Sequence, residues 1–331
     1  MNGTGTGAWI GERWAVVSIT VVAALAFLAS LLVGPTGFGL PSGGGVFGII
    51  FWEIRMPRAL LGALVGAALG MSGAALQGYL RNPLAEPGLL GVTGGASLGA
   101  VIAIHSGAAG AFAAALPIGG LAGAGLAAAS VLMLAGAHTG PLTLILAGVA
   151  MSSVAGALTA LAVNLSPNPF ASVEIVFWML GSLSDRSLVH VWLASPFIVA
   201  GLLLLMQMAK GLDALALGED AAFNLGINLR ALRVIVVVGS ALAVGAATAV
   251  AGAIGFVGLI VPHILRPIVG YLPSRLMVAS GLTGAALVLM ADVVLRLLPT
   301  SVDIRLGVAT AIVGAPFFLW LVLKSRRELL P

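Results

Sequence analysis

The feature that most constrains this chain is a series of apolar runs, each near 20 residues long, separated by short polar segments. A helix rises ~1.5 Å per residue, so about 20 residues cross a ~30 Å hydrocarbon core. Of 331 residues, 60% are hydrophobic and 8% are charged, whereas about a quarter of a soluble domain is charged. The alternation typical of membrane β-strands is missing. The sequence therefore predicts an all-α polytopic membrane protein with a single transmembrane domain over residues 1–331.

We expect about ten transmembrane helices, at 14–33, 58–79, 89–106, 112–135, 141–163, 190–209, 231–251, 254–268, 276–297 and 305–323. The first run is too long for the apolar part of a signal peptide, so we interpret it as a retained span. With the N-terminus inside, ten of the 15 basic residues fall on the inner side. The other five are Arg55, Arg58, Arg186, Arg296 and Arg305. The positive-inside rule then places both termini in the cytoplasm.

Several classes of function are disfavoured by the composition. There is no cysteine, and the four histidines are scattered without carboxylates at metal-ligand spacing, so we expect no metal, no cofactor and no catalytic site. The basic residues flank apolar runs instead of clustering, which argues against nucleic acid. Asp292 is an acid within a span. We favour a structural pairing with Arg296, one turn on, over a functional role for it.

Small residues recur three or four apart in the second span, as at Gly62, Gly66, Gly70 and Gly73. Such a face lets helix backbones approach closely inside a membrane. We therefore expect these glycines to pack helices together and to have no direct transport role.

Two arginines stand at the outer start of the second span, Arg55 and Arg58, on either side of Pro57. Pro57 suits the first turn of a helix, which would put both cations at the unfavourable positive end of the helix dipole. Cations kept there suggest an acidic partner outside the membrane. Arginines that reach lipid headgroups are an equally good interpretation.

A further outer segment lies between the fifth and sixth spans. Ser172 could cap a short helix that begins near Val173, with Asp185, Arg186 and His190 close by. This helix would be too short to span the membrane and would lie at the outer mouth.

Two irregular segments interrupt the apolar runs. Prolines and glycines from Asn82 to Gly88 predict a tight inner turn, in which Asn82 and Leu84 could narrow a pathway, although a plain connecting loop is the rival interpretation. Residues 252–263 combine glycine and proline in an apolar run and predict a broken helix. Broken segments in corresponding parts of two halves are typical of transport pathways.

The longest inner segment, residues 210–230, predicts two short helices outside the bilayer. Asp213 could cap the first, and Glu219 or Asp220 could start a second that ends at Gly226. Phe223 and Leu225 give this element an apolar side. An element apolar on one side and charged on the other resembles a docking surface for a cytosolic protein.

Together these segments resemble the FecCD-type permeases, the membrane subunits of ABC importers for iron–siderophores, heme and cobalamin. The matching text runs from about residue 50 to the C-terminus and includes RMPRALLGALVGAALG, QGYLRNPLAEPGLLGV, LGEDAAFNLGINLRALR and AGAIGFVGLIVPHILR.

The resemblance implies a ten-helix subunit of the bacterial inner membrane that works as a homodimer with two cytosolic ATPases and a periplasmic binding protein. It implies that Arg55, Arg58 and Arg296 receive acidic residues of the binding protein, and that Asn82 and Leu84 belong to an inner gate. The ATPase-coupling segment would comprise Gly218, Glu219, Asp220, Phe223, Leu225 and Gly226. Arg305 departs from the family pattern as an additional outer cation.

The resulting expectation is the translocation subunit of an ATP-driven importer, without enzymatic activity of its own. We rank iron chelates, including heme, ahead of cobalamin, because they are the commoner cargo of the resembled family. An ion-driven secondary transporter would need a relay of buried acids, and an intramembrane enzyme would need a catalytic cluster. Neither is apparent in the sequence.

Overall fold

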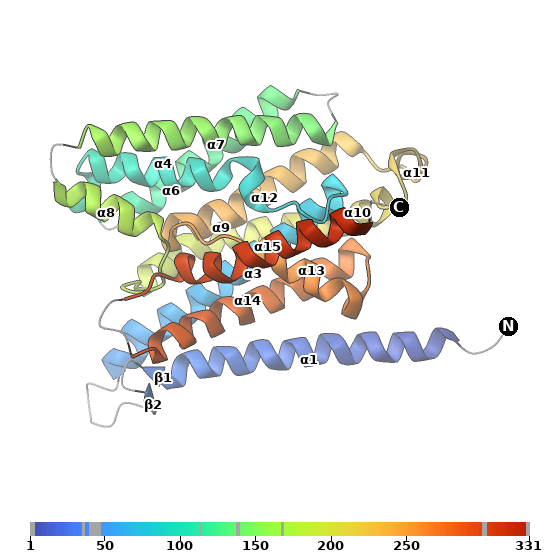
Figure 1. The fold of residues 1–331 in the computed structure, drawn as a ribbon, viewed down its shortest axis with the longest axis horizontal. Helices are drawn as coiled ribbons and strands as arrows, with labels where there is room; N and C mark the ends of the chain where they lie inside the picture. Colours follow the sequence, from blue (N-terminus) through green and yellow to red (C-terminus); the bar gives the residue numbers. More distant parts are fainter. Residues whose placement is uncertain are drawn as a thin grey trace.

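The computed structural model describes residues 4–34, 37–39, 48–112, 114–136, 140–166, 169–299 and 303–328. Ten helices correspond one to one with the ten expected spans (Figure 1). These helices are α1 (Thr4–Leu32), α3 (Met56–Leu80), α4 (Val92–His105), α6 (Ala115–Ala135), α7 (Pro141–Asn164), α9 (Leu188–Gln207), α12 (Leu229–Ala251), α13 (Val257–Val269), α14 (Pro273–Leu297) and α15 (Leu306–Glu328). Eight helical segments of the described chain are long and apolar enough to cross a membrane, while α4 and α13 are shorter.

Short elements occupy the two ends of the bundle. At one end lie the two-residue strands β1 (Val33–Gly34) and β2 (Gly37–Phe38), which pair antiparallel, and α8 (Pro169–Met179). At the other end lie α10 (Ala209–Leu215) and α11 (Glu219–Asn224), together with the first turn of α1 and the last turns of α15 (Figure 1). The remaining short elements are η1 (Ile50–Arg55), η2 (Pro87–Leu90) and α5 (Ala108–Ala111). We call the β1–β2 end the outer end and the α10–α11 end the inner end.

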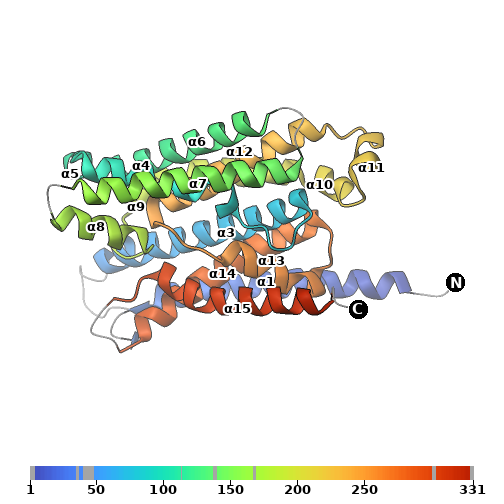
Figure 2. The ribbon, with the colours of Figure 1, turned by 45° about the horizontal axis from the view of Figure 1, so that its top comes forward.

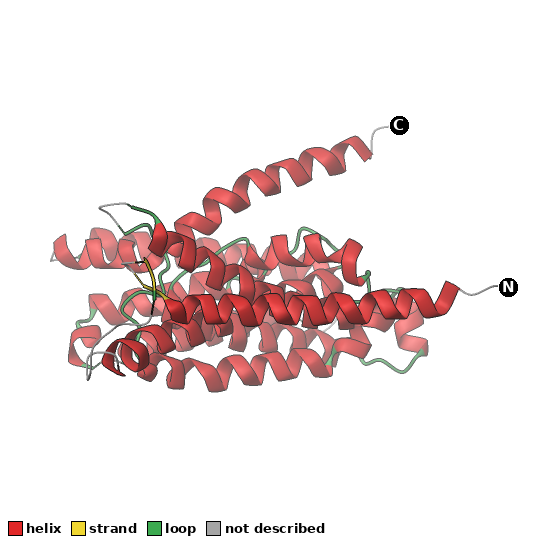
Figure 3. Ribbon diagram, turned by 90° about the horizontal axis from the view of Figure 1, so that it is seen from below, coloured by secondary structure: helices red, strands yellow, loops and turns green. Residues whose placement is uncertain are grey.

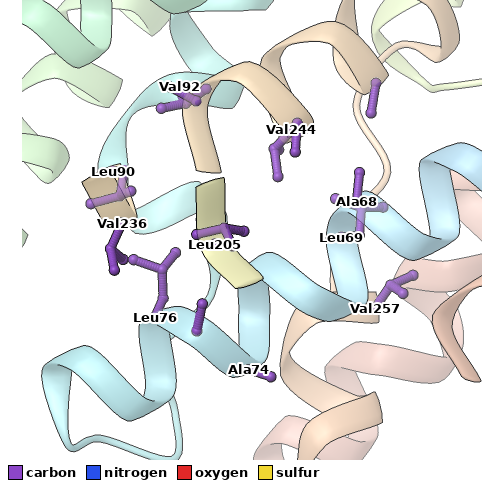
Figure 4. Packing of buried hydrophobic residues seen from close by; sticks show 14 of the residues in the cluster. Ala68, Leu69, Ala74, Leu76, Leu90, Val92, Leu205, Val236, Val244 and Val257 are labelled. Atoms are coloured by element: carbon purple, nitrogen blue, oxygen red, sulfur yellow. The ribbon is translucent and has the colours of Figure 1, made fainter. Parts of the chain in front are cut away.

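Helix α3 runs through the middle of the molecule, with α4, α6 and α7 on one side and α1 and α14 on the other (Figures 1 and 2). Leu76 of α3, Leu90 of η2 and Val236 of α12 meet in the buried core (Figure 4). The predicted glycine face is confirmed, because Gly66 and Gly70 lie directly against the backbone of α14 at Gly284 and Ser280. A side chain at either glycine would collide with a carbonyl group, so close backbone contact sets the spacing of these two helices.

Two predicted helix starts are wrong. The second span continues outward beyond Pro57 as the π-helix η1, so Arg55 and Arg58 lie within a helix and not at its positive end. Proline removes one backbone hydrogen bond of a helix, and the wider π turn ends just before it, at Arg55. Helix α8 already begins at Pro169, so Ser172 lies inside it, and its hydroxyl donates to the Val163 carbonyl, 3.4 Å away.

Candidate functional site

Arg55, expected to face an acidic partner, turns its guanidinium into the protein. Nη1 donates to three backbone carbonyls, those of Leu31 (2.9 Å), Leu32 (3.2 Å) and Gly39 (2.9 Å), and the residue is 8% exposed. These carbonyls come from the end of α1 and the chain that follows it. Arg55 therefore ties the outer end of α1 to the second span.

Arg58 and Arg296 share one buried carboxylate. Arg58 Nη2 lies 2.7 Å from Asp292 Oδ1, and its Nε lies 3.0 Å from both carboxylate oxygens. Arg296 Nη2 lies 2.6 Å from Asp292 Oδ2, while Nη1 donates to the Ser30 and Val33 carbonyls. The predicted pairing of Asp292 with Arg296 is confirmed, and Arg58 is a second partner that the sequence did not indicate.

An outer cavity of about 520 Å³ collects the remaining polar groups of this end. It is lined by the described residues Glu53, Ile54, Arg58, Ser182, Leu183, Ser184, Asp185, Arg186, Ser187, Leu295, Arg296, Leu298, Asp303, Ile304 and Arg305. Asp185 and Arg186 therefore lie at the outer mouth, as expected. His190 does not line the cavity, and its Nδ1 accepts a hydrogen bond from the Ser187 N–H (3.2 Å) at the start of α9. Arg55 does not line it either.

The inner turn after α3 holds the two expected gate residues. Arg81 ends α3 in the left-handed conformation (φ +49°), and Asn82 Oδ1 then accepts a hydrogen bond from the Leu84 N–H (2.9 Å). Asn82 lines an inner cavity of about 270 Å³ together with Arg81, Gln77 and Arg266. Leu84 is half-buried and does not line this cavity. The turn is thus a defined structure, fixed by an asparagine side chain.

The two irregular segments, residues 82–88 and residues 252–263, pack against each other. Gln77 links them. Its Nε2 donates to the carbonyls of Ala85 (3.1 Å) and Gly258 (3.3 Å), and its Oε1 accepts from Arg266 Nη2 (2.7 Å). Sequence reasoning missed Gln77 and Arg266, although polar side chains within apolar runs are a signal of function or of internal bonding.

The expected break over residues 252–263 is confirmed, because the chain is non-helical from Gly252 to Phe256 and α13 starts at Val257. Phe256 has a φ of +67°, rare for a residue other than glycine. Its backbone lies close to the carboxylate of Glu86, from the other irregular segment. Glu86 was not singled out from the sequence, because its partner lies 170 residues away along the chain (256 − 86).

The predicted coupling segment is an ordered helical pair. Helix α11 begins at Glu219, directly after Gly218 (φ +114°), and the chain turns again at Gly226 (φ +80°). Phe223 is 73% exposed, and Leu225 is exposed as well. Exposed apolar surface of this kind is typical of sites that contact another protein or the membrane.

Two acids of this segment make specific contacts. Glu219 Oε1 lies 3.0 Å from Arg81 Nη2, so the start of α11 is joined to the residue that precedes the inner turn. The prediction that Asp213 caps the first short helix is wrong. Asp213 lies within α10, and its Oδ1 accepts from the Ser274 N–H (2.8 Å) at the start of α14. Tertiary contact with another helix replaces the local cap.

Comparison with known proteins gives the class of this bundle. Residues 16–324 match the FecCD transport family. Vitamin B12 import system permeases of Salmonella paratyphi A and Salmonella typhimurium are each 40% identical over 320 residues, covering 95% of this chain and 96% of theirs. A solved metal-chelate type ABC transporter in an inward-facing conformation has 32% identity and a TM-score of 0.84, covering 93% of this chain and 98% of that one.

The chain belongs to the FecCD transport family. It is the multi-pass permease subunit of an ABC importer and is not itself catalytic. The expected ranking placed iron chelates ahead of cobalamin, whereas the named permeases are those of vitamin B12 import.

Proposed function

We propose that this permease carries cobalamin inward across the bacterial inner membrane, as part of an ATP-driven importer. The observation that supports this cargo is the 40% identity to vitamin B12 permeases over 95% of the chain. A substrate-binding protein delivers the cargo at the outer cavity, and two ATPases bind at α10 and α11. Both termini lie on the ATPase side, in the cytoplasm, in agreement with the excess of basic residues there.

The mechanism is alternating access, in which the ATPases move α11 and thereby the turn that holds Asn82 and Leu84. The contact between Glu219 and Arg81 supports a direct link between these two elements. Arg58 and Arg296 remain candidates for contact with the binding protein, because both line the outer cavity. Arg55 supports the docking surface from behind, through its three carbonyl contacts.

The working unit is a homodimer of this chain. Helix α15, the last helix of the chain, leans away from the rest of the bundle (Figure 3). It exposes Ile312, Val313, Leu319 and Leu323. A second copy that packs against α15 would cover part of this apolar surface and place a pathway between the two subunits.

The test measures ATP hydrolysis by the complete complex in lipid nanodiscs. The complex contains this permease with the ATPase and the substrate-binding protein of the same transport system. Cyanocobalamin, ferric hydroxamate siderophore and heme are each loaded on the binding protein in parallel. We expect cyanocobalamin alone to stimulate hydrolysis. Stimulation by an iron chelate and none by cyanocobalamin would reject the proposed cargo while leaving the importer class intact.

An iron or other metal chelate is the second candidate cargo. It is favoured by the likeness to the solved metal-chelate type transporter, whose identity to this chain is lower, at 32%. The same ATPase experiment separates the two cargoes.

A further inference from the structure

The start of α12 carries an arginine that reaches two neighbouring helices. Arg233 is half-buried, and its Nε donates to the Tyr79 hydroxyl near the end of α3, 3.0 Å away. Its Nη1 donates to the carbonyl of Gly136, the residue that directly follows α6, also at 3.0 Å. One guanidinium group therefore holds the inner ends of α3, α6 and α12 together.

The same arginine lies between α11 and the start of α7. A small cavity of about 50 Å³ is lined by Arg233 and Tyr79, by Glu219 at the start of α11, and by Pro141, the first residue of α7. Glu219 pairs with Arg81, which follows Tyr79 closely at the end of α3. A movement of α11 that pulls on Arg81 would therefore reach Tyr79 and, through its hydroxyl, Arg233.

Arg233 acts on α7 through the end of α6. Only residues 137–140 lie between Gly136 and Pro141 in the sequence, so the position of Gly136 limits where α7 can begin. A guanidinium group is planar and presents its donors in a rigid fork. Its two bonds therefore fix Tyr79 relative to Gly136 in direction as well as in distance, so a shift at one is passed to the other.

Helix α7 is an element that such a contact can move. Within the single chain, one side of it is exposed along most of its length, as at Leu142, Leu146 and Leu161. Elements that bury little apolar surface belong to the less stable part of a fold. On its other side, a Cβ at Gly148 would collide with the carbonyl of Leu89 in η2, which follows the inner turn. A shift of α7 would thus act on the chain directly after this turn.

We propose that Arg233 is a positioning residue that couples the movement of α11 to the start of α7. On the α11 side the path runs through Glu219, Arg81 and Tyr79. On the α7 side it runs through Gly136. This inference rests on the proposed function, in which the ATPases move α11, and it adds a second branch beside the contact with the inner turn.

The first measurement is cobalamin uptake per ATP hydrolysed, by the complete complex in proteoliposomes. Arg233→Gln is expected to lower this ratio about tenfold, the scale of one charge-assisted hydrogen bond. Arg233→Lys keeps the charge but loses the planar fork, so it should recover only part of the ratio. Tyr79→Phe removes one of the two acceptors and should lower the ratio by a smaller factor.

The second measurement follows α7 itself and does not depend on the cargo. Because the chain has no cysteine, Leu142→Cys at the start of α7 takes one spin label per chain before the ATPase is added. In otherwise wild-type protein, ATP with vanadate should change the mobility of this label, seen in its electron paramagnetic resonance spectrum. With Arg233→Gln the complex should still hydrolyse ATP, but most of the change in the label should be lost.

The matched control is Arg230→Gln, which removes one positive charge from an exposed position on the first turn of α12. It should behave like the wild type in both measurements. Wild-type behaviour of Arg233→Gln in either measurement overturns the inference and leaves the proposed function standing. A wild-type label that does not respond to ATP also overturns it, because α7 would then not move.

Failure of the proposed function gives a different result. If cyanocobalamin does not stimulate hydrolysis by the wild-type complex, the proposed cargo is rejected, while the label on α7 still decides the role of Arg233. If Arg233→Gln does not assemble with the ATPase, Arg233→Lys and Tyr79→Phe decide it by the same two measurements.

Discussion

The ion pairs at the two ends of the bundle are built in opposite ways. At the outer end, Asp292 is 2% exposed and is bound by two arginines whose side chains are 19% and 6% exposed. At the inner end, Arg81 and Glu219 are 47% and 52% exposed. A buried carboxylate between two cations cannot lose a partner cheaply, whereas an exposed pair contributes about 0–1 kcal/mol and exchanges readily. The outer cluster of Asp292 and its two arginines is suited to a fixed structure. The inner pair is suited to a contact that forms and breaks.

Removing the shared carboxylate is the strongest test of this comparison. Asp292→Ala leaves two poorly exposed arginines without their partner, so we expect the free energy of unfolding to fall by about 3–5 kcal/mol. The thermal unfolding midpoint in detergent measures this loss. Asp303→Ala is the control, since Asp303 is exposed at the same end and forms no ion pair with a described residue. Equal shifts in the two variants would mean that the outer network does not stabilise the fold.

Removing the buried side-chain amide of Gln77, which links the two irregular segments, should lower the free energy of unfolding by an intermediate amount. Gln77→Leu leaves Arg266 and two carbonyls without their partner, so we expect a loss of about 1–3 kcal/mol. The measurement is again the unfolding midpoint. Ser72→Ala, on the same helix, removes a buried hydroxyl that has no partner among the described residues and should have little effect. A neutral Gln77→Leu would show that these segments are held by packing alone.

The inner ion pair should affect coupling more than stability. Arg81→Glu and Glu219→Arg should each change stability by about 1 kcal/mol or less, and each should lower cobalamin uptake per ATP hydrolysed several-fold. The double exchange should restore most of the ratio, because it rebuilds the pair with reversed charges. Proteoliposome uptake measured beside phosphate release gives the ratio. Coupling unaffected by either single variant would remove the pair from the proposed link.

The smallest effect on stability is expected at the exposed aromatic of α11. Phe223→Ala removes a side chain with few internal contacts, so the unfolding midpoint should change by less than the equivalent of ~0.5 kcal/mol. Association with the ATPase should weaken about tenfold or more, as for a central aromatic of an interface. Copurification of the ATPase with the permease measures this. Retention equal to wild type would move the docking surface away from Phe223.

Much of the fold could be predicted from the sequence, because the thickness of a bilayer fixes the length of each apolar run. The glycine face on α3 was predictable for a related reason, since small residues at helical spacing have few other uses in a membrane. Helix ends were less certain. Asp213 and Ser172 looked like local caps, but both lie inside helices and bond to other parts of the chain.

The contacts of charged residues were predictable only where they are local. Asp292 and Arg296 are one helical turn apart, so their pairing follows from the helix itself. Arg58 reaches the same carboxylate across 234 residues, and Arg55 bonds to carbonyls 16 to 24 residues away, at the end of α1 and in the chain that follows it. Such contacts leave no periodic signal. For this reason the sequence predicted which arginines lie at the outer end but not which of them are already bound.

The central claim is that the two ends receive different partners, and the absence of cysteine from the chain makes it directly testable. Single variants Glu53→Cys, at the outer cavity, and Phe223→Cys, on α11, are labelled with a thiol-reactive photo-crosslinker. Each is then illuminated in the complete complex. We predict that Glu53→Cys captures only the substrate-binding protein and Phe223→Cys captures only the ATPase. Capture of the ATPase from position 53, or of the binding protein from position 223, would contradict the account.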